Sequence, residues 1–137
     1  MRKRLMLLWT PIVLALALLL PSSTLAVSYG KITLVSEYCS GQDTINATFK
    51  VTKYSGFYAY KLTITAKGQE YWAGSWHNAY NIGTWTKVVD TYGSATFKRS
   101  FWYNPANGYN GRIVAIGKIW GSGGYLIASG KTRSGYC

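Results

Sequence analysis

Aromatic rings next to cationic or amide side chains are the groups of this sequence best suited to chemistry. Two runs, Phe101-Trp102-Tyr103 and Tyr71-Trp72, place large rings at consecutive positions, and Lys98 and Arg99 precede the first run. Flat rings stack on sugar C–H faces or on nucleic-acid bases, and cations beside them bind anions or make cation–π contacts. The candidate ligand-binding residues are Trp72, Trp76, His77, Asn78, Tyr80, Trp85, Lys98, Arg99, Trp102 and Tyr109.

The segment 71–81 is the least strand-like part of the chain after residue 26 and the richest in groups that could bind a ligand. It combines stacking rings such as Trp76 with the amide of Asn78 and with His77, the single histidine. A second loop of similar character, Asn-Gly-Tyr-Asn-Gly, occupies 107–111. Amides beside rings suit a carbohydrate, because its hydroxyls need directional hydrogen-bond partners. The alternative is that both are surface loops packed by their own tyrosines.

Titratable groups are few and scattered, which argues against catalysis. The chain has four carboxylates and one histidine, and Glu70 with His77 is the best conceivable pair. General acid–base chemistry needs positioned titratable groups, and neither a nucleophile elbow nor a paired-carboxylate motif occurs. Two distant cysteines and one histidine do not make a tetrahedral zinc site. We therefore expect no enzyme activity, no cofactor and no metal.

The first 26 residues are typical of a secretory signal peptide. Basic residues 2–4 precede an apolar core at 5–20, and a helix-breaking, small-residue region follows and ends at Ala26. Cleavage after Ala26 predicts a secreted, extracellular protein with one domain at 27–137 and no stable transmembrane anchor. The alternative is an uncleaved membrane anchor, although Pro11 interrupts the apolar run.

Net charge favours anionic partners. The whole chain has 137 residues, 15 Lys and Arg and four Asp and Glu; cleavage removes 26 residues and three cations, leaving 111 residues and a net charge of +8. Such a charge attracts polyanions at a distance, including acidic glycans, nucleic acid and anionic membrane surfaces. The cations are spread along the chain, so only folding could gather them into a patch. The alternative is a basic protein without a polyanionic partner.

Apolar and polar residues alternate through most of 27–137, which is typical of antiparallel strands. The expected strands are 29–38, 44–52, 58–67, 70–80, 84–92, 95–103, 112–120 and 124–130, with turn residues such as Lys67-Gly68-Gln69 between them. Ser55-Gly56 predicts a turn that pairs 44–52 with 58–67 as a hairpin. Apolar residues on both faces of 112–120 predict a central, covered strand, with 124–130 folded back beside it.

Strands at this spacing predict an all-β fold, a small antiparallel β-sandwich of about seven to eight strands after an N-terminal signal helix. Cys39 and Cys137 are the two cysteines, and in an oxidising compartment we expect them to form one disulfide that clasps the chain. An intermolecular bridge or a reactive thiol is the alternative. Because neighbours on a strand point to opposite faces, at least one ring of each aromatic run must lie outside the core.

These features together predict a secreted, non-enzymatic binding module, which we expect to be monomeric. Its aromatic and basic surface would recognise an anionic or carbohydrate polymer of a cell envelope or extracellular matrix. The first alternative is a secreted antagonist, either a bacteriocin-like cationic antimicrobial protein or an inhibitor of another protein. A second alternative is an extracellular nucleic-acid binder, whose affinity would fall steeply with salt.

Overall fold

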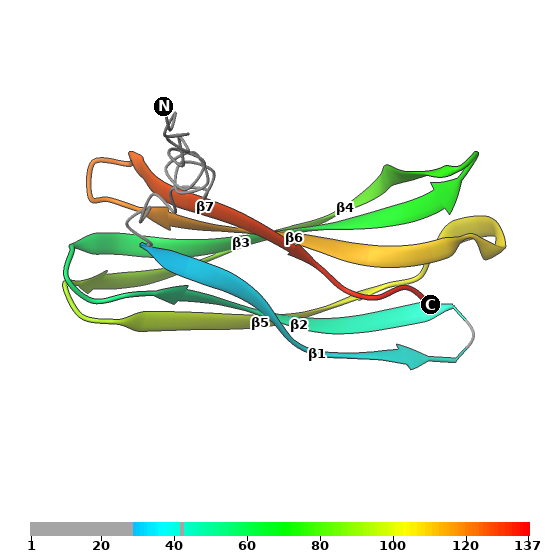
Figure 1. Cartoon of the computed structure of the whole chain (residues 1–137), viewed down its shortest axis with the longest axis horizontal. Coiled ribbons are helices and arrows are strands. Elements are labelled where there is room, and N and C mark those ends of the chain that lie inside the picture. Colours follow the sequence, from blue (N-terminus) through cyan, green and yellow to red (C-terminus); the bar gives the residue numbers. More distant parts are fainter. Residues whose placement is uncertain (1–28, 42) are drawn as a thin grey trace, which may run out of the picture.

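The computed structural model describes residues 29–41 and 43–137, and these form two antiparallel sheets packed face to face (Figure 1). The predicted signal peptide, residues 1–26, lies outside the described residues. In the part of the chain that the structure describes, no helix has the length and apolar character needed to cross a membrane. The expected all-β sandwich is confirmed.

Seven strands make up the sandwich. They are β1 (Gly30–Ser40), β2 (Thr44–Lys53), β3 (Ala59–Trp72), β4 (Ser75–Thr91), β5 (Ala95–Tyr103), β6 (Asn110–Trp120) and β7 (Leu126–Arg133), with a short 3-10 turn, η2 (Ala106–Gly108), before β6. One sheet has the order β1-β2-β5 and the other β4-β3-β6-β7. β4 and β5 are therefore edge strands on one side of the sandwich, and β1 and β7 are edge strands on the other. This arrangement positions the candidate site described below.

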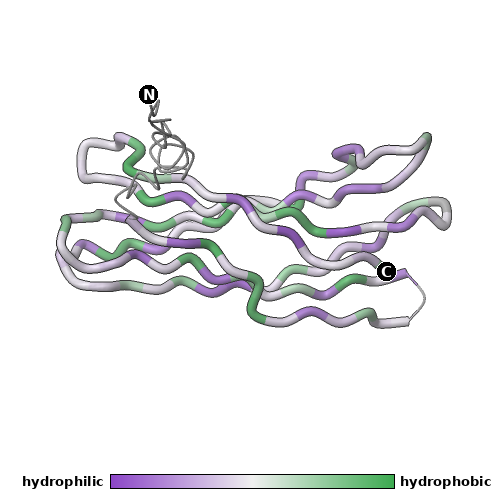
Figure 2. The backbone as a smooth tube through the Cα atoms, viewed as in Figure 1, coloured by the Kyte–Doolittle hydropathy of each residue, from purple (hydrophilic) through white to green (hydrophobic). Residues whose placement is uncertain are grey.

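The core lies between the inner faces of the two sheets. Every second residue of β2, from Ile45 to Val51, is at most 2% exposed, and the polar residues between them face solvent. Leu62 and Ile64 of β3 and Ile113 of β6 are fully buried opposite them. Figure 2 shows the resulting alternation of apolar and polar stretches along the strands. β6 lies between β3 and β7, so the predicted covered strand and its hairpin with β7 are confirmed.

The segment 71–81 is neither the single strand expected over 70–80 nor the irregular surface loop of the alternative. It is the tip of a long hairpin in which Ala73-Gly74, both at positive φ, turns β3 into β4. Lys67-Gly68-Gln69 likewise continues β3 instead of separating two strands. Gly68 is required there for packing, because a Cβ at this position would lie 2.5 Å from the ring of Tyr103 in the opposite sheet. The glycine that suggested a turn is therefore needed because it lets the two sheets approach each other closely.

The predicted hairpin of 44–52 with 58–67 was also wrong. β2 belongs to the three-stranded sheet and β3 to the four-stranded sheet, so the chain crosses between the layers at Ser55-Gly56. Two consecutive strands with alternating apolar and polar residues, joined by a short turn, can pair side by side in one sheet or pack face to face in two sheets. The periodicity of the two segments is the same in both arrangements, and only their partners in space distinguish them.

A buried lysine holds the crossover. Lys53 is fully buried at the end of β2, and its ammonium donates hydrogen bonds to the carbonyls of Tyr54, Tyr92 and Gly93 at 3.0, 3.1 and 2.5 Å. The ammonium also lies 4.3 Å from the centre of the Phe57 ring. Burial lowers the pKa of Lys53, whereas the three carbonyl acceptors favour its charged form. The crossover and the β4–β5 turn are therefore tied together by one side chain.

The expected disulfide is confirmed. Cys39 near the end of β1 is bonded to Cys137, with 98 residues of sequence separation. The backbone of Cys137 also exchanges hydrogen bonds with Gly111 at the start of β6. The C-terminal residue thus bridges the two sheets, because β1 and β6 belong to different layers.

Replacing both cysteines by serine should lower the free energy of unfolding by about 4 to 5 kcal/mol, because the bond closes a very long loop of the unfolded chain. Urea unfolding followed by circular dichroism would measure the change, with the reduced wild type as a second sample expected to match the variant. A decrease in the free energy of unfolding of less than about 1 kcal/mol would contradict this stabilising role of the disulfide.

Candidate binding cleft

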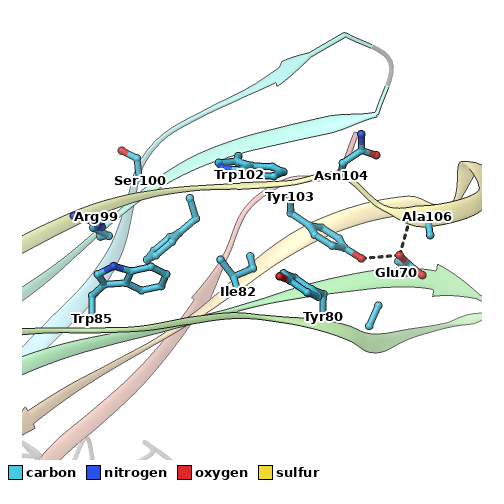
Figure 3. Close-up of a pocket in the computed structure, with 12 residues that line it drawn as sticks. Glu70, Tyr80, Ile82, Trp85, Arg99, Ser100, Trp102, Tyr103, Asn104 and Ala106 are labelled. Atoms are coloured by element: carbon cyan, nitrogen blue, oxygen red, sulfur yellow. Dashed lines mark hydrogen bonds between the residues drawn. The ribbon is translucent and has the colours of Figure 1, made fainter.

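A cleft of about 680 Å³ opens on the side of the sandwich where β4 and β5 form the sheet edges (Figure 3). The two edge strands belong to different sheets, so no ladder of backbone hydrogen bonds joins them. The gap between them is therefore lined by side chains from both layers. Its volume lies in the range of small-molecule sites. The lining residues are Glu70, Ala79, Tyr80, Ile82, Trp85, Arg99, Ser100, Phe101, Trp102, Tyr103, Asn104 and Ala106.

Four aromatic rings form the walls of the cleft. The rings of Tyr80 on β4 and Tyr103 on β5 are nearly parallel, 8° apart in plane with centres 6.3 Å apart. Further along, Trp85 packs against Phe101 at 4.9 Å. Tyr103 and Phe101 are almost completely buried, whereas Tyr80 is 61% exposed. The buried rings thus pack against Tyr80 and Trp85, and Tyr80 keeps most of its surface open to a ligand.

A cation lies at the Trp85 end of the cleft. The guanidinium of Arg99 is 5.3 Å from the centre of the Trp85 ring, and the Arg99 side chain is exposed. Beyond it, the ammonium of Lys87 on β4 donates a hydrogen bond to the carbonyl of Thr96 on β5 at 3.3 Å. The two sheet edges are thus connected near this end of the cleft, and Arg99 supplies donors to it.

A carboxylate lies at the opposite end. Glu70 on β3 is 8% exposed, and its Oε1 accepts hydrogen bonds from the Tyr103 hydroxyl at 2.6 Å and from the backbone N–H of Ala106 at 2.9 Å. Figure 3 shows both bonds converging on this oxygen. Burial and, second, the hydrogen bond to Glu70 raise the pKa of Tyr103. Glu70 therefore anchors the β5–β6 connection and the ring of Tyr103 together.

The predicted exposure of one ring in the run 101–103 is confirmed. Phe101 is 4% and Tyr103 is 5% exposed, whereas Trp102 between them is 69% exposed. The ring of Trp102 lies on the far side of the β5 ribbon from the Tyr103 ring (Figure 3). By the same alternation, Lys98 faces outward from the three-stranded sheet, opposite Lys50 of β2. Lys98 therefore points away from the cleft, and Trp102, which lines it, turns its ring to the outer side of β5.

Four of the ten predicted ligand-binding residues, Tyr80, Trp85, Arg99 and Trp102, line the cleft, and the first three direct their side chains into it. Four others, Trp72, Trp76, His77 and Asn78, lie at the tip of the β3–β4 hairpin. There the ring of His77 stacks on Trp72 at 3.9 Å, and its Nε2 is 2.8 Å from the Ser75 hydroxyl. Tyr109 follows η2 and is 41% exposed.

Glu70 and His77, the pair best placed for catalysis in the sequence, are register partners across β3 and β4. Their hydrogen bonds nevertheless go to different groups, because Glu70 bonds to Tyr103 and Ala106 and His77 bonds at the hairpin turn. The two side chains do not form a proton-transfer pair in this structure.

The contribution of Glu70, Phe101, Tyr103 and Ile82 to the cleft was not predicted. Tyr103 was recognised as part of an aromatic run, but its partner Gly68 was interpreted as a turn residue. A glycine inside a strand pattern is a signal for close backbone approach, and it could have indicated that a large ring packs there.

Replacing Tyr103 by phenylalanine should lower the free energy of unfolding at pH 7 by about 1.5 to 3 kcal/mol, because a hydrogen bond to a charged group is lost. Because the folded-state pKa is raised, this stabilisation is fully present below about pH 10 and is lost as the pH rises through the folded pKa. Urea unfolding at pH 7 and pH 11 would therefore show a smaller difference from wild type at pH 11. Tyr38→Phe, at an exposed ring on β1, should change neither value; equal effects of both variants would contradict the role of the Glu70 bond.

No protein-family model matches the chain, and no curated protein matches its sequence. Among solved structures, a "putative beta-galactosidase from bacteroides fragilis" is similar over 76% of this chain and 16% of that one, with 16% identity and a TM-score of 0.49. A beta-glucosidase from Kluyveromyces marxianus in complex with glucose is similar over 81% of this chain and 15% of that one, with 9% identity and a TM-score of 0.39. The chain thus spans about a sixth of the length of each, and at these values neither likeness bears on its activity.

Proposed function

We propose that this protein is a secreted, non-enzymatic binding module that holds a carbohydrate chain in the β4–β5 cleft. The observation that carries the proposal is the set of oriented rings, Tyr80, Tyr103 and Trp85, beside the charged groups of Arg99 and Glu70. A sugar has apolar C–H faces that stack on rings and hydroxyls that need donors and acceptors. The cleft offers both kinds of partner within one opening.

The position of the cleft favours a polymer over a single small molecule. It lies along the side of the sandwich, between two edge strands, and Tyr80 at its rim is mostly exposed. Tyr80 and Trp85 both lie on β4, roughly 16 Å apart along the strand, so a chain of sugars could contact them with separate units. Arg99 would favour a chain that carries acidic groups.

Binding without bond cleavage is part of the proposal. Most glycoside hydrolases use two carboxyl groups that flank the bond. Among the described residues that line the cleft, Glu70 is the one carboxylate, and its Oε1 is occupied by Tyr103 and Ala106. Glu37 and Asp43 lie on or beside β1 and β2, and Asp90, near the end of β4, bonds to Tyr58 and does not line the cleft. The disulfide is compatible with export, as the leader-like residues 1–26 predict.

Glycan-array binding of the purified protein would test the function directly, and retention on polysaccharides of cell envelopes or matrices is expected. Retention on none of them would contradict it. Growth inhibition of bacteria at low dose without any glycan binding would favour the secreted antagonist instead.

Tyr80→Ala should weaken binding of the retained oligosaccharide roughly tenfold, because a stacking face worth about 1.4 kcal/mol is lost. Tyr38→Ala is the matched control, since Tyr38 is 63% exposed, close to the 61% of Tyr80, but lies on β1 away from the cleft. Calorimetric titration of both variants would give the affinities. A loss in the control as large as in Tyr80→Ala would exclude the cleft as the site.

A further inference from the structure

The outward face of the four-stranded sheet carries half of the cations of residues 27–137. On β6 the side of Ile113 and Ile119 is buried, so Arg112 and Lys118 point away from the core. The register places outward residues of β3 and β7 beside them. We call this surface the basic face, and its cations are Lys61, Lys67, Arg112, Lys118, Lys131 and Arg133.

The six cations occur in five successive rows, so the positive charge extends along the length of the strands. Successive rows hold Lys61 beside Trp120, Lys118 beside Thr63, Lys131 beside Ile116, Lys67 and Arg133 on either side of Val114, and Arg112 beside Gln69. Rows are two residues apart, about 7 Å, so the five rows cover about 27 Å along the sheet. Every row has at least one positive charge.

Among the described residues, no Asp or Glu side chain is placed in these rows. Glu70 faces the inside of the sandwich, and Asp43 precedes β2. Glu37 on β1 accepts a hydrogen bond from the backbone of Gly135, after the end of β7. Asp90 lies beyond the Lys61 row and bonds to Tyr58. Burial and, second, the charge of Arg133 lower the pKa of Arg112. The like charges of the basic face are thus close enough to interact, and an anionic partner would relieve their repulsion.

Aromatic rings hold several of these cations in place. The ammonium groups of Lys61 and Lys118 each lie 5.5 Å from the Trp120 ring, whose Nε1 donates a hydrogen bond to Thr63 at 3.0 Å. At the other end, the Arg112 guanidinium lies 4.0 Å from the Trp76 ring, and its Nε donates to Gln69 at 2.8 Å. Cations held in this way lose less conformational entropy when an anion binds.

We propose that the basic face is a second binding site, separate from the cleft, and that it binds a linear acidic polysaccharide lengthwise along β3, β6 and β7. Charge complementarity over five consecutive rows supports a long, narrow polyanion. Sugar rings have a length comparable to the row spacing, so an acidic polysaccharide presents its charges at a similar interval. The site does not depend on the cleft, because its residues point away from the core.

The same face is less suited to nucleic acid or to a membrane. Stacking of bases needs open ring faces, but cations already cover Trp76 and Trp120. Insertion into a bilayer needs projecting apolar side chains along the surface, whereas Ile116 in the middle row is only partly exposed and Val114 in the next row is 3% exposed. The exposed apolar Val88 and Leu126 are near one end only.

The test compares two triple variants with the same change in net charge. The first, Lys67→Gln/Lys118→Gln/Lys131→Gln, removes charge from the basic face. The second, Lys31→Gln/Lys50→Gln/Lys98→Gln, removes it from the outward face of the three-stranded sheet. Binding to polygalacturonate is measured by calorimetry at several salt concentrations, with neutral dextran as the uncharged polymer.

The first variant should bind polygalacturonate at least tenfold more weakly at low salt and show a shallower salt dependence, by up to about one unit of log–log slope per cation removed. The second should bind within about threefold of wild type. Equal losses in both would show that net charge alone attracts the polymer, and this would overturn the proposal. Tighter binding of wild type to an oligothymidylate or to phosphatidylserine vesicles than to polygalacturonate would also overturn it. Tyr80→Ala, measured in the same way, reports how much of this binding belongs to the cleft. A loss in Tyr80→Ala with no loss in the first triple variant would place the polymer in the cleft and overturn the basic-face site. Absence of neutral-glycan binding would contradict the cleft alone.

Discussion

The pleat of the β-strand is the constraint on which the rest of this structure depends. Because neighbouring side chains point to opposite faces, each strand contributes one set of residues to the core and another to the surface. β3 shows this most clearly: Glu70 faces inward to Tyr103, and Gln69 beside it faces outward to Arg112. The cleft and the basic face are therefore built from interleaved residues of the same strands, and each can have its own chemistry.

The cleft exists because the edge strands of the two sheets lie next to each other without pairing into one sheet. β4 and β5 are consecutive in sequence, yet they belong to different layers, so their free edges face the same side. Sheet edges expose backbone groups and invite pairing with other chains. Here rings and charged side chains occupy that side, and the Lys87 hydrogen bond to Thr96 connects the two edges at one point. The exposed edges of β4 and β5 thus lie on the same side of the sandwich as the cleft, the surface best suited to a ligand.

Much of the fold follows from local periodicity, and the errors follow from what periodicity omits. Alternation in 44–52 indicated a strand with one inner face, and apolar residues on both faces of 112–120 indicated a covered central strand. The two cysteines indicated the disulfide. Alternation carries no information about the partner of a strand, so β2 and β3 were paired wrongly. For the site, the exposed ring at 102 could be predicted, but the meeting of Tyr80, Trp85 and Arg99 depends on which edges lie together. That is a property of topology and not of any one segment.

The pairing of β3 with β6 runs from Lys61↔Trp120 to Tyr71↔Asn110 without a single shift, whereas β3 and β4 accommodate three irregularities. A one-residue deletion in the centre of β3 would exchange the inward and outward sets beyond it, burying lysine and exposing leucine or isoleucine. Insertions and deletions at the β4 side can be absorbed by bulges of the kind already present. During divergence, this domain should consequently tolerate length changes in β4 and point substitutions in β3, but very few length changes in β3 or β6.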